Sequence, residues 1–158
     1  MDLPQATPEA IKEPRTDTTL TDEDYRVPAD LRYALRRFLR VSERHARALG
    51  ITPQQHLLLL AVRGHPAYPR VTITEIAEHL QLRHNGASLL VERAVQRELL
   101  CRREDPTDRR RALVSLTEKG MHVLTEITRA NRAELRAMEG SDTRLSTLME
   151  QIGLASLS

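Results

Sequence analysis

The sequence has little cysteine and few aromatic residues. One cysteine and no tryptophan occur among its 158 residues, and aromatic side chains make up 3% of the chain. A single cysteine excludes an internal disulfide and fits a reducing compartment. Because large aromatic side chains are scarce, the core must be built from leucine, valine, isoleucine and alanine. That composition favours helices.

Long apolar runs and enzyme-like constellations are also missing. No run approaches the ~20 residues of a membrane span. The acidic, proline-rich start lacks the layout of a signal peptide. We therefore expect a cytoplasmic protein with no membrane partner. Nothing singles out a nucleophile with a base, or a carboxylate pair, so we expect no enzyme. The six histidines and one cysteine show no compact ligand spacing, which predicts no metal and no cofactor.

The net charge of +2 is unevenly distributed. Residues 1–24 contain two basic and seven acidic residues, a formal charge of −5, which leaves +7 for the rest. We interpret residues 1–24 as a disordered acidic tail because they have little apolar content; an arm that shields a DNA-binding face is the alternative. A basic body suggests a polyanionic partner, although a solubilising surface explains the imbalance equally well.

The centre of the chain predicts a helix-turn-helix. Thr72 and Glu75 have the spacing of a capping box and precede an apolar pattern of helical period. Residues 81–83 are a short connection. A second amphipathic helix follows, with Ala87, Val91 and their neighbours on one face and polar side chains on the other.

A charged hairpin follows directly. Residues 99–103 predict one strand, residues 105–108 a turn that the aspartate side chains and Pro106 favour, and Arg109 starts the return strand. Ala112, Val114 and Leu116 then share one face. A hairpin with a charged tip after a helix-turn-helix is a winged helix.

Two motifs in this hairpin resemble the MarR family of bacterial winged-helix transcriptional regulators. They are Asp105-Pro106-x-Asp108-Arg109-Arg110 and Val114-x-Leu116-Thr117-Glu118-Lys119-Gly120. The resemblance covers roughly residues 30–156. One departure is Glu98, which stands where the family usually has glycine.

The predicted fold class is mainly α with a small β-hairpin wing: a winged helix-turn-helix with N- and C-terminal dimerisation helices. We expect one MarR-like domain over residues 25–158. Its DNA-binding lobe should span about 53–117 and its dimerisation helices about 29–49 and 118–156, with a break at Gly140 and a last helix over 143–152. In the family such helices pair between two subunits, which here implies a homodimer. The dimerisation residues are then Leu31, Leu35, Leu145, Leu148, Met149 and Ile152.

The predicted partner of the second helix is double-stranded DNA. The major groove admits one α-helix, and side chains of its N-terminal turn reach base edges. The resemblance further implies that Asp108 braces the wing and that Arg110, on the same face of an extended segment, enters the minor groove. The DNA-binding residues predicted are Arg83, His84, Asn85, Gly86, Ser88, Arg93, Arg109, Arg110 and Arg111, and Arg102 and Arg103 are expected at phosphates.

The protein is predicted to be a ligand-responsive repressor that binds a pseudo-palindromic operator. Family members commonly release DNA when a small aromatic or lipophilic anion enters a cleft beside the dimerisation helices. Candidate cleft residues here are Tyr33, Arg37, Phe38, His45 and His56. The alternatives are a winged-helix module that binds another protein, and a redox- or metal-responsive regulator. Cys101 is expected to be a small buried strand residue.

Overall fold

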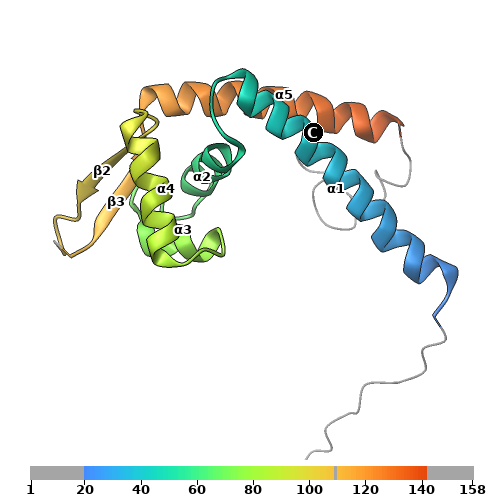
Figure 1. Ribbon diagram of the computed structural model, residues 1–158, viewed down its shortest axis with the longest axis horizontal. Helices are drawn as coiled ribbons and strands as arrows, with labels where there is room; N and C mark the ends of the chain where they lie inside the picture. Colours follow the sequence, from blue (N-terminus) through green and yellow to red (C-terminus); the bar gives the residue numbers. More distant parts are fainter. Residues whose placement is uncertain (1–19, 109, 142–158) are drawn as a thin grey trace, which may run out of the picture.

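The computed structural model describes residues 20–108 and 110–141. Figure 1 shows a lobe of α2, α3, α4 and the β2–β3 hairpin beneath one end of α5, which continues beyond the lobe. Helix α1 packs against α5, and the N-terminal end of α1 extends away from the lobe. The elements are α1 (Asp22–Ala48), α2 (Pro53–Arg63), β1 (Val71–Thr72), α3 (Ile73–His79), α4 (His84–Gln96), β2 (Leu100–Glu104), β3 (Ala112–Leu116) and α5 (Glu118–Ser141).

Helix α1 begins earlier than the sequence predicted. The expected start was residue 29, but the helix begins at Asp22, so residues 22–24 of the predicted tail form its first turn. The Asp24 carboxylate accepts hydrogen bonds from the backbone N–H and the hydroxyl of Thr21, at 2.7 and 2.8 Å. Acidic side chains at a helix N-terminus also interact favourably with the helix dipole. Pro28 lies inside the helix. Residues 1–19 of the predicted tail lie outside the described residues.

Helix α2 begins at Pro53, the residue at which the DNA-binding lobe was expected to start. Thr52 and Gln55 form a reciprocal capping box, and Pro53 occupies the first turn. The apolar run Leu57–Val62 predicts burial on several sides of the helix. Leu58 and Leu59 are fully buried, whereas Leu57 and Leu60 are 54% and 41% exposed, so the burial does not extend all the way round.

The sheet has one strand more than the sequence predicted. β1 pairs with β3, and β3 pairs with β2, all antiparallel, in the order β1-β3-β2. Val114 is the central position, since it is paired with Val71 on one side and with Arg102 on the other. The return strand begins at Ala112, not at Arg109 as predicted. Three backbone hydrogen bonds among residues 105, 108 and 111 close turns there instead.

The main core lies between the lobe helices and the sheet. Aliphatic side chains supply it, as the scarcity of aromatics predicted. Its fully buried members include Leu58, Leu59, Val62, Val71, Ile76, Val91, Leu99, Leu100, Val114 and Ile127. Ile127 comes from α5, so the lobe and the long helix share this core.

A smaller contact joins α1 to α5. Ala34 packs there with Phe38 and Leu135. A polar chain also crosses the contact: the amide of Asn131 donates to the Ser42 hydroxyl at 2.9 Å, and its oxygen lies 3.0 Å from Nδ1 of His45. α5 continues through Gly140, where a break was expected, to Ser141. The helix predicted over 143–152 lies outside the described residues.

Three helices end in the same way. The residue after each C-cap is left-handed: Gly50 after α1 (φ 75°), Gln81 after α3 (φ 54°) and Glu98 after α4 (φ 59°). Its N–H and the next N–H return to carbonyls of the last helical turn, which is the Schellman arrangement. Glycine adopts this conformation without steric cost, whereas glutamine and glutamate do not. Glu98, the departure from the family pattern, therefore keeps the turn geometry at some cost in strain.

Replacing Glu98 with glycine should stabilise the protein. The change removes the left-handed strain, and it loses only an exposed ion pair with Lys119, which contributes little. Glycine also makes the unfolded chain more flexible, which offsets part of this stabilisation. We therefore expect the free energy of unfolding, measured by urea denaturation, to rise by about 0.5–1 kcal/mol. Glu98→Ala is the control, because it loses the ion pair and keeps the strain. A glycine variant less stable than the alanine variant would contradict the assignment.

His56 makes stability depend on pH. It is 6% exposed, and its Nε2 has no hydrogen-bond partner among the described residues. Burial lowers the pKa of His56 below its usual 6.5 because the charged ring is poorly solvated there. As the pH falls below 6.5, the unfolded chain takes up this proton before the folded protein does. The contribution of neutral His56 to the free energy of unfolding should therefore be fully present above that pH. Below it, the free energy of unfolding should fall by at most about 1.4 kcal/mol per pH unit.

A urea midpoint measured at pH 7.5 and at pH 5.5 tests this. His56→Leu should flatten the difference between the two pH values. The matched control is His122→Leu, because His122 is exposed on α5 and its replacement should leave the wild-type pH dependence. Equal pH dependence in wild type and His56→Leu would assign the effect to other groups.

Candidate nucleic-acid interface

Helix α4 presents a polar N-terminal turn to solvent. Ala87, Val91 and Ala94 are buried and attach the helix to the lobe. Of the predicted DNA-binding residues on and before this helix, Ser88 is half-buried and the others are exposed: Arg83, His84, Asn85, Gly86 and Arg93. No side chain caps the helix at Arg83. Its first N–H groups therefore remain available to a negatively charged ligand.

Helix α3 holds α4 in this position. The Thr72 N–H donates to the Glu75 carboxylate at 2.7 Å, and the Glu75 N–H donates to the Thr72 hydroxyl at 3.3 Å, so the predicted capping box is confirmed. The hydrogen bonds from Thr72 lower the pKa of Glu75, the backbone bond most strongly. Thr72 also pairs with Leu113 of β3, so one residue joins the helix-turn-helix to the wing strands.

The wing is braced by Asp105. Its side chain is only 4% exposed. One carboxylate oxygen accepts from the Thr107 hydroxyl at 2.7 Å, the Thr107 N–H at 2.9 Å and the Arg70 guanidinium at 3.2 Å. The Asp105 N–H donates to the Arg111 carbonyl at 3.0 Å across the hairpin. Asp105 therefore connects the wing tip to the segment that enters β1.

The same contacts keep this carboxyl charged. The hydrogen bond from the Thr107 hydroxyl lowers the pKa of Asp105 most, and the Thr107 N–H acts next. Burial works in the opposite direction, while Arg70 and Arg111 favour the carboxylate. The charged form is the one that both Thr107 bonds and the Arg70 ion pair require.

Asp108 shapes the tip locally. Its carboxylate accepts from the Arg110 N–H at 3.0 Å, and its carbonyl accepts from the Arg111 N–H at 2.9 Å. The expectation that Asp108 and Arg110 lie on the same face of an extended segment is wrong, because this part of the chain turns. The bracing role of Asp108 stays a prediction, and the contact from the tip to β1 comes from Asp105.

A hollow of about 470 Å³ lies between α3, α4 and the wing. It brings together side chains that are far apart in the sequence. His84 and Ser88 face it from α4, and arginines face it from the wing; its polar lining comprises Thr72, Thr74, Glu75, His84, Ser88, Arg102, Arg110 and Arg111. Of the residues predicted to contact DNA, five meet here: His84, Ser88, Arg102, Arg110 and Arg111.

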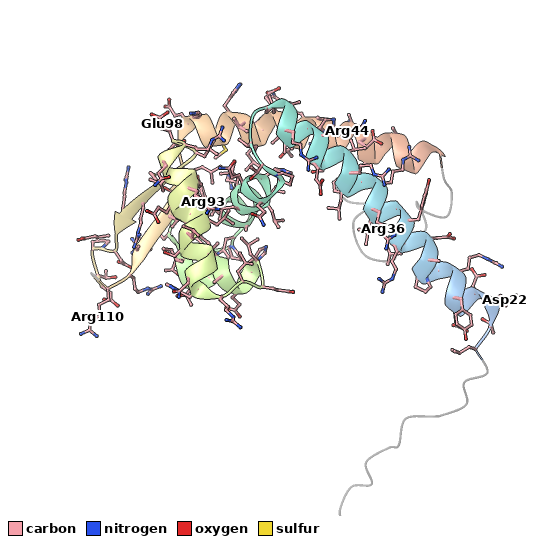
Figure 2. The ribbon with its side chains drawn as sticks, viewed as in Figure 1. Asp22, Arg36, Arg44, Arg93, Glu98 and Arg110 are labelled. Atoms are coloured by element: carbon pink, nitrogen blue, oxygen red, sulfur yellow. The ribbon has the colours of Figure 1, made fainter. Side chains whose placement is uncertain are left out.

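The other predicted residues lie elsewhere. Gly86 and Arg93 line a smaller apolar hollow of about 250 Å³ between α2 and α4. Arg109 lies outside the described residues. Figure 2 places Arg110 at the far tip of the wing and Arg93 on the body of α4. Arg103 lines a further hollow on the hairpin with Arg102, Arg110 and Arg111, so arginines from both sides of the hairpin meet there.

Sequence reasoning missed Thr74 and Arg70. Thr74 faces the large hollow because the capping box turns the start of α3 toward α4. Nothing in the sequence distinguishes it from other threonines. Arg70 lies 35 positions from Asp105, and their ion pair exists only because β1 joins the sheet. A strand of two residues gives no periodic signal by which to find it.

The five candidate cleft residues are spread over two helices. Tyr33 is 68% exposed, and Phe38 packs in the contact between α1 and α5. Nη2 of Arg37 lies 3.9 Å from Oε1 of Glu134. His45 contacts Asn131, and His56 is buried in α2. None of the five lines the apolar hollow between α2 and α4.

Cys101 is half-buried on β2, and its Sγ lies 3.1 Å from the Ser115 hydroxyl. Among residues 20–108 and 110–141, histidine, cysteine and acidic side chains form no group of three that could hold a metal. In the same ranges, none of the helices is both long and apolar enough to cross a bilayer.

Comparison with known proteins shows a similarity to the MarR family. The sequence model of that family matches residues 49–111, which include the helix-turn-helix and the wing up to Arg111. The matched segment is less than half of the chain. It is 29% identical over 84 residues to the HTH-type transcriptional repressor MdtR of Bacillus subtilis, covering 53% of this chain. The chain spans about half the length of that relative, 52%.

Solved MarR structures have the same fold. The MarR family transcription regulator SP03579 matches with a TM-score of 0.71 at 24% identity, over 85% of this chain and 87% of that one. A mutant form of MepR from S. aureus, solved bound to an oligodeoxyribonucleotide, matches with a TM-score of 0.62 at 19% identity, over 82% and 94%. The predicted winged-helix fold is thereby confirmed.

Proposed function

We propose that this chain is a transcriptional regulator of the MarR family, acting as a repressor, that binds a pseudo-palindromic DNA duplex as a homodimer. The observation that carries the proposal is the hollow between α4 and the wing. One of its sides is the N-terminal turn of a helix with exposed polar side chains, and another is a hairpin rich in arginine. A winged helix that reads DNA needs a helix for the major groove and a cationic extension for the backbone or minor groove.

The charges of the wing are available for a polyanion. Arg102, Arg103 and Arg110 form no ion pair within the described part of the chain. Asp105, the buried acid of the wing, is already occupied by Thr107 and Arg70. Unpaired guanidinium groups at an exposed tip match phosphates and the negative potential of a narrow minor groove.

The relatives support this interpretation. The MepR mutant was solved on an oligodeoxyribonucleotide, and its fold matches that of this chain. MdtR is named a transcriptional repressor, and its similarity covers about half of each chain. Repression and DNA binding by the present protein are proposed on these grounds together with the geometry of the hollow.

The homodimer is proposed from the surface of α1. Leu35 and Leu39 are 49% and 54% exposed on a helix that runs away from its own lobe (Figure 1). Among the described residues of one copy, the apolar cluster between α1 and α5 is small and consists of Ala34, Phe38 and Leu135. A second copy would cover these leucines. Leu31 is half-buried, and the other proposed dimerisation residues, at 145, 148, 149 and 152, lie outside the described residues.

Response to a small aromatic or lipophilic anion is also proposed. The hollow between α2 and α4 suits such a ligand better than the five dispersed candidates do. Leu57, Leu82 and Leu89 supply apolar surface there, and Arg93 and Gln54 supply polar contacts. Apolar walls with a few polar groups are the usual composition of a ligand site. Since Arg93 lies on the recognition helix, a ligand there would act directly on DNA binding.

Two alanine variants should separate the wing from the recognition helix. Arg110→Ala removes a cation, so it should weaken operator binding by roughly 1–3 kcal/mol and reduce the salt slope by about one unit. Asn85→Ala removes neutral hydrogen-bonding groups. It should relax preference at one or two base pairs per half-site and leave the salt slope unchanged. Fluorescence anisotropy over a salt series, on operator DNA and on single-base substitutions, measures both effects.

The matched control is Arg129→Ala, which removes an exposed arginine from α5, far from the wing. It should bind DNA as wild type does. If Arg110→Ala also binds like wild type at every salt concentration, the wing does not contact DNA. A salt-independent wild-type complex would favour the alternative of a winged-helix module that binds another protein.

A further inference from the structure

Three chain segments meet where the lobe joins the long helices. They are the turn after α1, the turn after α4 and the start of α5. We call this meeting point the helix-end junction and define it by Gly50, Arg97, Glu98, Thr117 and Lys119. Figure 2 shows Glu98 at the end of α4 that lies beside the beginning of α5, at the opposite end of the lobe from Arg110.

Side chains from one segment bind backbone carbonyls of another at this junction. The Arg97 guanidinium donates to the Gly50 carbonyl at 2.8 Å, and Lys119 Nζ donates to the Arg97 carbonyl at 2.9 Å. The Thr117 hydroxyl donates to the Glu98 carbonyl at 2.6 Å. Lys119 also lies 3.2 Å from the Glu98 carboxylate. The last carbonyls of a helix have no partner within it, so these bonds satisfy groups that otherwise need water.

The arrangement fixes the direction of α4. Arg97 is the C-cap of α4, and it connects α1 on one side with Lys119 of α5 on the other. Both long helices are therefore tied to the end of α4 that is farthest from its DNA-facing turn. A rotation at the junction would be amplified at the opposite end of the helix.

Helix α4 is long enough that a small tilt moves its DNA-facing turn by about the rise of one base pair. α4 has 13 residues, so it is ~20 Å long at the usual helical rise. A tilt of ~10° about its C-terminal end would move its N-terminal turn by ~3.4 Å, which equals the rise of about one base pair. A dimer that reads two half-sites requires its two recognition helices to keep a fixed separation.

We propose that Arg97 and Lys119 are positioning residues that set the spacing between half-sites that the dimer accepts. The inference rests on the proposed function, since it assumes two copies on one duplex. Neither residue lies on the face of the lobe that carries His84 and Arg110, so neither is assigned a contact with a base. Their effect on binding acts through the direction of α4.

The test uses the full-length protein and duplexes selected from a random pool. The enriched half-site is built into inverted repeats whose central spacer is the selected length, one base pair shorter or one base pair longer. Binding is measured by anisotropy for wild type, Lys119→Met and Arg97→Met. Lys119→Arg is the conservative variant that can still donate to the Arg97 carbonyl. Arg129→Met is the matched control, because it removes an exposed cation from α5 away from the junction.

We expect wild type, Lys119→Arg and Arg129→Met to bind the duplex with the selected spacer about tenfold more tightly than the duplexes with a shorter or longer spacer. This difference in affinity is on the scale of one mismatched base pair. Lys119→Met and Arg97→Met should reduce that preference to about threefold or less. Their affinity for a duplex with one half-site should stay within about twofold of wild type, because no DNA contact is removed. A general loss of stability would lower binding to all duplexes and would not change the spacer preference.

Two results contradict different claims. If Lys119→Met and Arg97→Met keep the wild-type spacer preference, the junction does not set the spacing, and the positioning role is wrong. If wild type binds no inverted repeat better than shuffled DNA, the proposed function itself is contradicted, and the spacing role falls with it.

Discussion

Gly120→Ala is expected to destabilise the folded protein by about 3 kcal/mol, the upper end of the usual cost of inserting a methyl group into packed structure. A Cβ at this position would lie 2.0 Å from the Leu99 carbonyl oxygen and 2.9 Å from its carbon. Both atoms are backbone, so no rotamer change can relieve the contact. The glycine allows α5 to start directly against the turn that follows α4, where Thr117 and Lys119 make their bonds.

The matched control is Gly86→Ala. Gly86 lies in α4, and a Cβ there would meet nothing within 4 Å. Because alanine favours helix over glycine, this variant should gain about 0.5–1 kcal/mol. Chemical denaturation of the two variants therefore has opposite expected signs for the same substitution. A Gly120→Ala variant as stable as wild type would mean that α5 does not approach Leu99 as described.

Asp105→Ala should have the largest effect on DNA binding that does not come from a DNA contact. The change leaves the Thr107 N–H and hydroxyl and the Arg70 guanidinium without their acceptor. Removing a buried acceptor of this kind costs about 1–3 kcal/mol, and the cost falls on the wing. We expect operator affinity to fall by roughly tenfold to a hundredfold as Arg110 and Arg111 lose their fixed position.

Charge alone predicts the opposite result. Removal of a negative charge near DNA should tighten binding, so a weaker complex identifies Asp105 as a structural brace. Asp108→Asn is the control, because its side-chain oxygen can still accept from the Arg110 N–H on an exposed turn. It should bind at least as tightly as wild type. Tighter binding by Asp105→Ala in an anisotropy assay would show that the wing needs no brace.

The order of the helices and the wing could be predicted from sequence because each depends on a local pattern. The capping box of Thr72 and Glu75 marks the start of α3, and the structure confirms it. The period of the apolar residues in α4 identifies its buried face at Ala87, Val91 and Ala94. Such signals require only neighbours within one or two turns of the chain.

The parts that were missed depend on distant contacts. β1 has two residues and exists because β3 offers it a free edge. Leu57 and Leu60 look like core residues, yet α2 leaves them exposed, and no periodicity distinguishes them from Leu58 and Leu59. The start of α1 was placed too late because Pro28 lies inside the helix. The turn predicted over residues 105–108 continues past Asp108, because the Arg111 N–H donates to the Asp108 carbonyl, and the return strand therefore begins at Ala112 and not at Arg109.

The candidate site was predicted in part. His84, Ser88, Arg110 and Arg111 meet at one hollow, as expected for a recognition helix beside a wing. Their contacts with DNA remain predictions. The bracing role that the family resemblance implies for Asp108 stays a prediction, and the buried contacts of Asp105 could not be foreseen, since only the folded sheet brings Arg70 within reach. The helix-end junction could not be inferred, because its bonds join residues 19 to 47 positions apart.

Selection of DNA from a random duplex pool tests the central claim most directly. The purified chain is incubated with the pool at ~0.15 M salt, where specific complexes are commonly 10³-fold or more tighter than non-specific ones. The bound fraction is then amplified and sequenced. The account predicts enrichment of an inverted repeat whose half-sites lie about 10–10.5 base pairs apart, one turn of the double helix. A bound pool with no enriched sequence, or with a single unrepeated site, would contradict it.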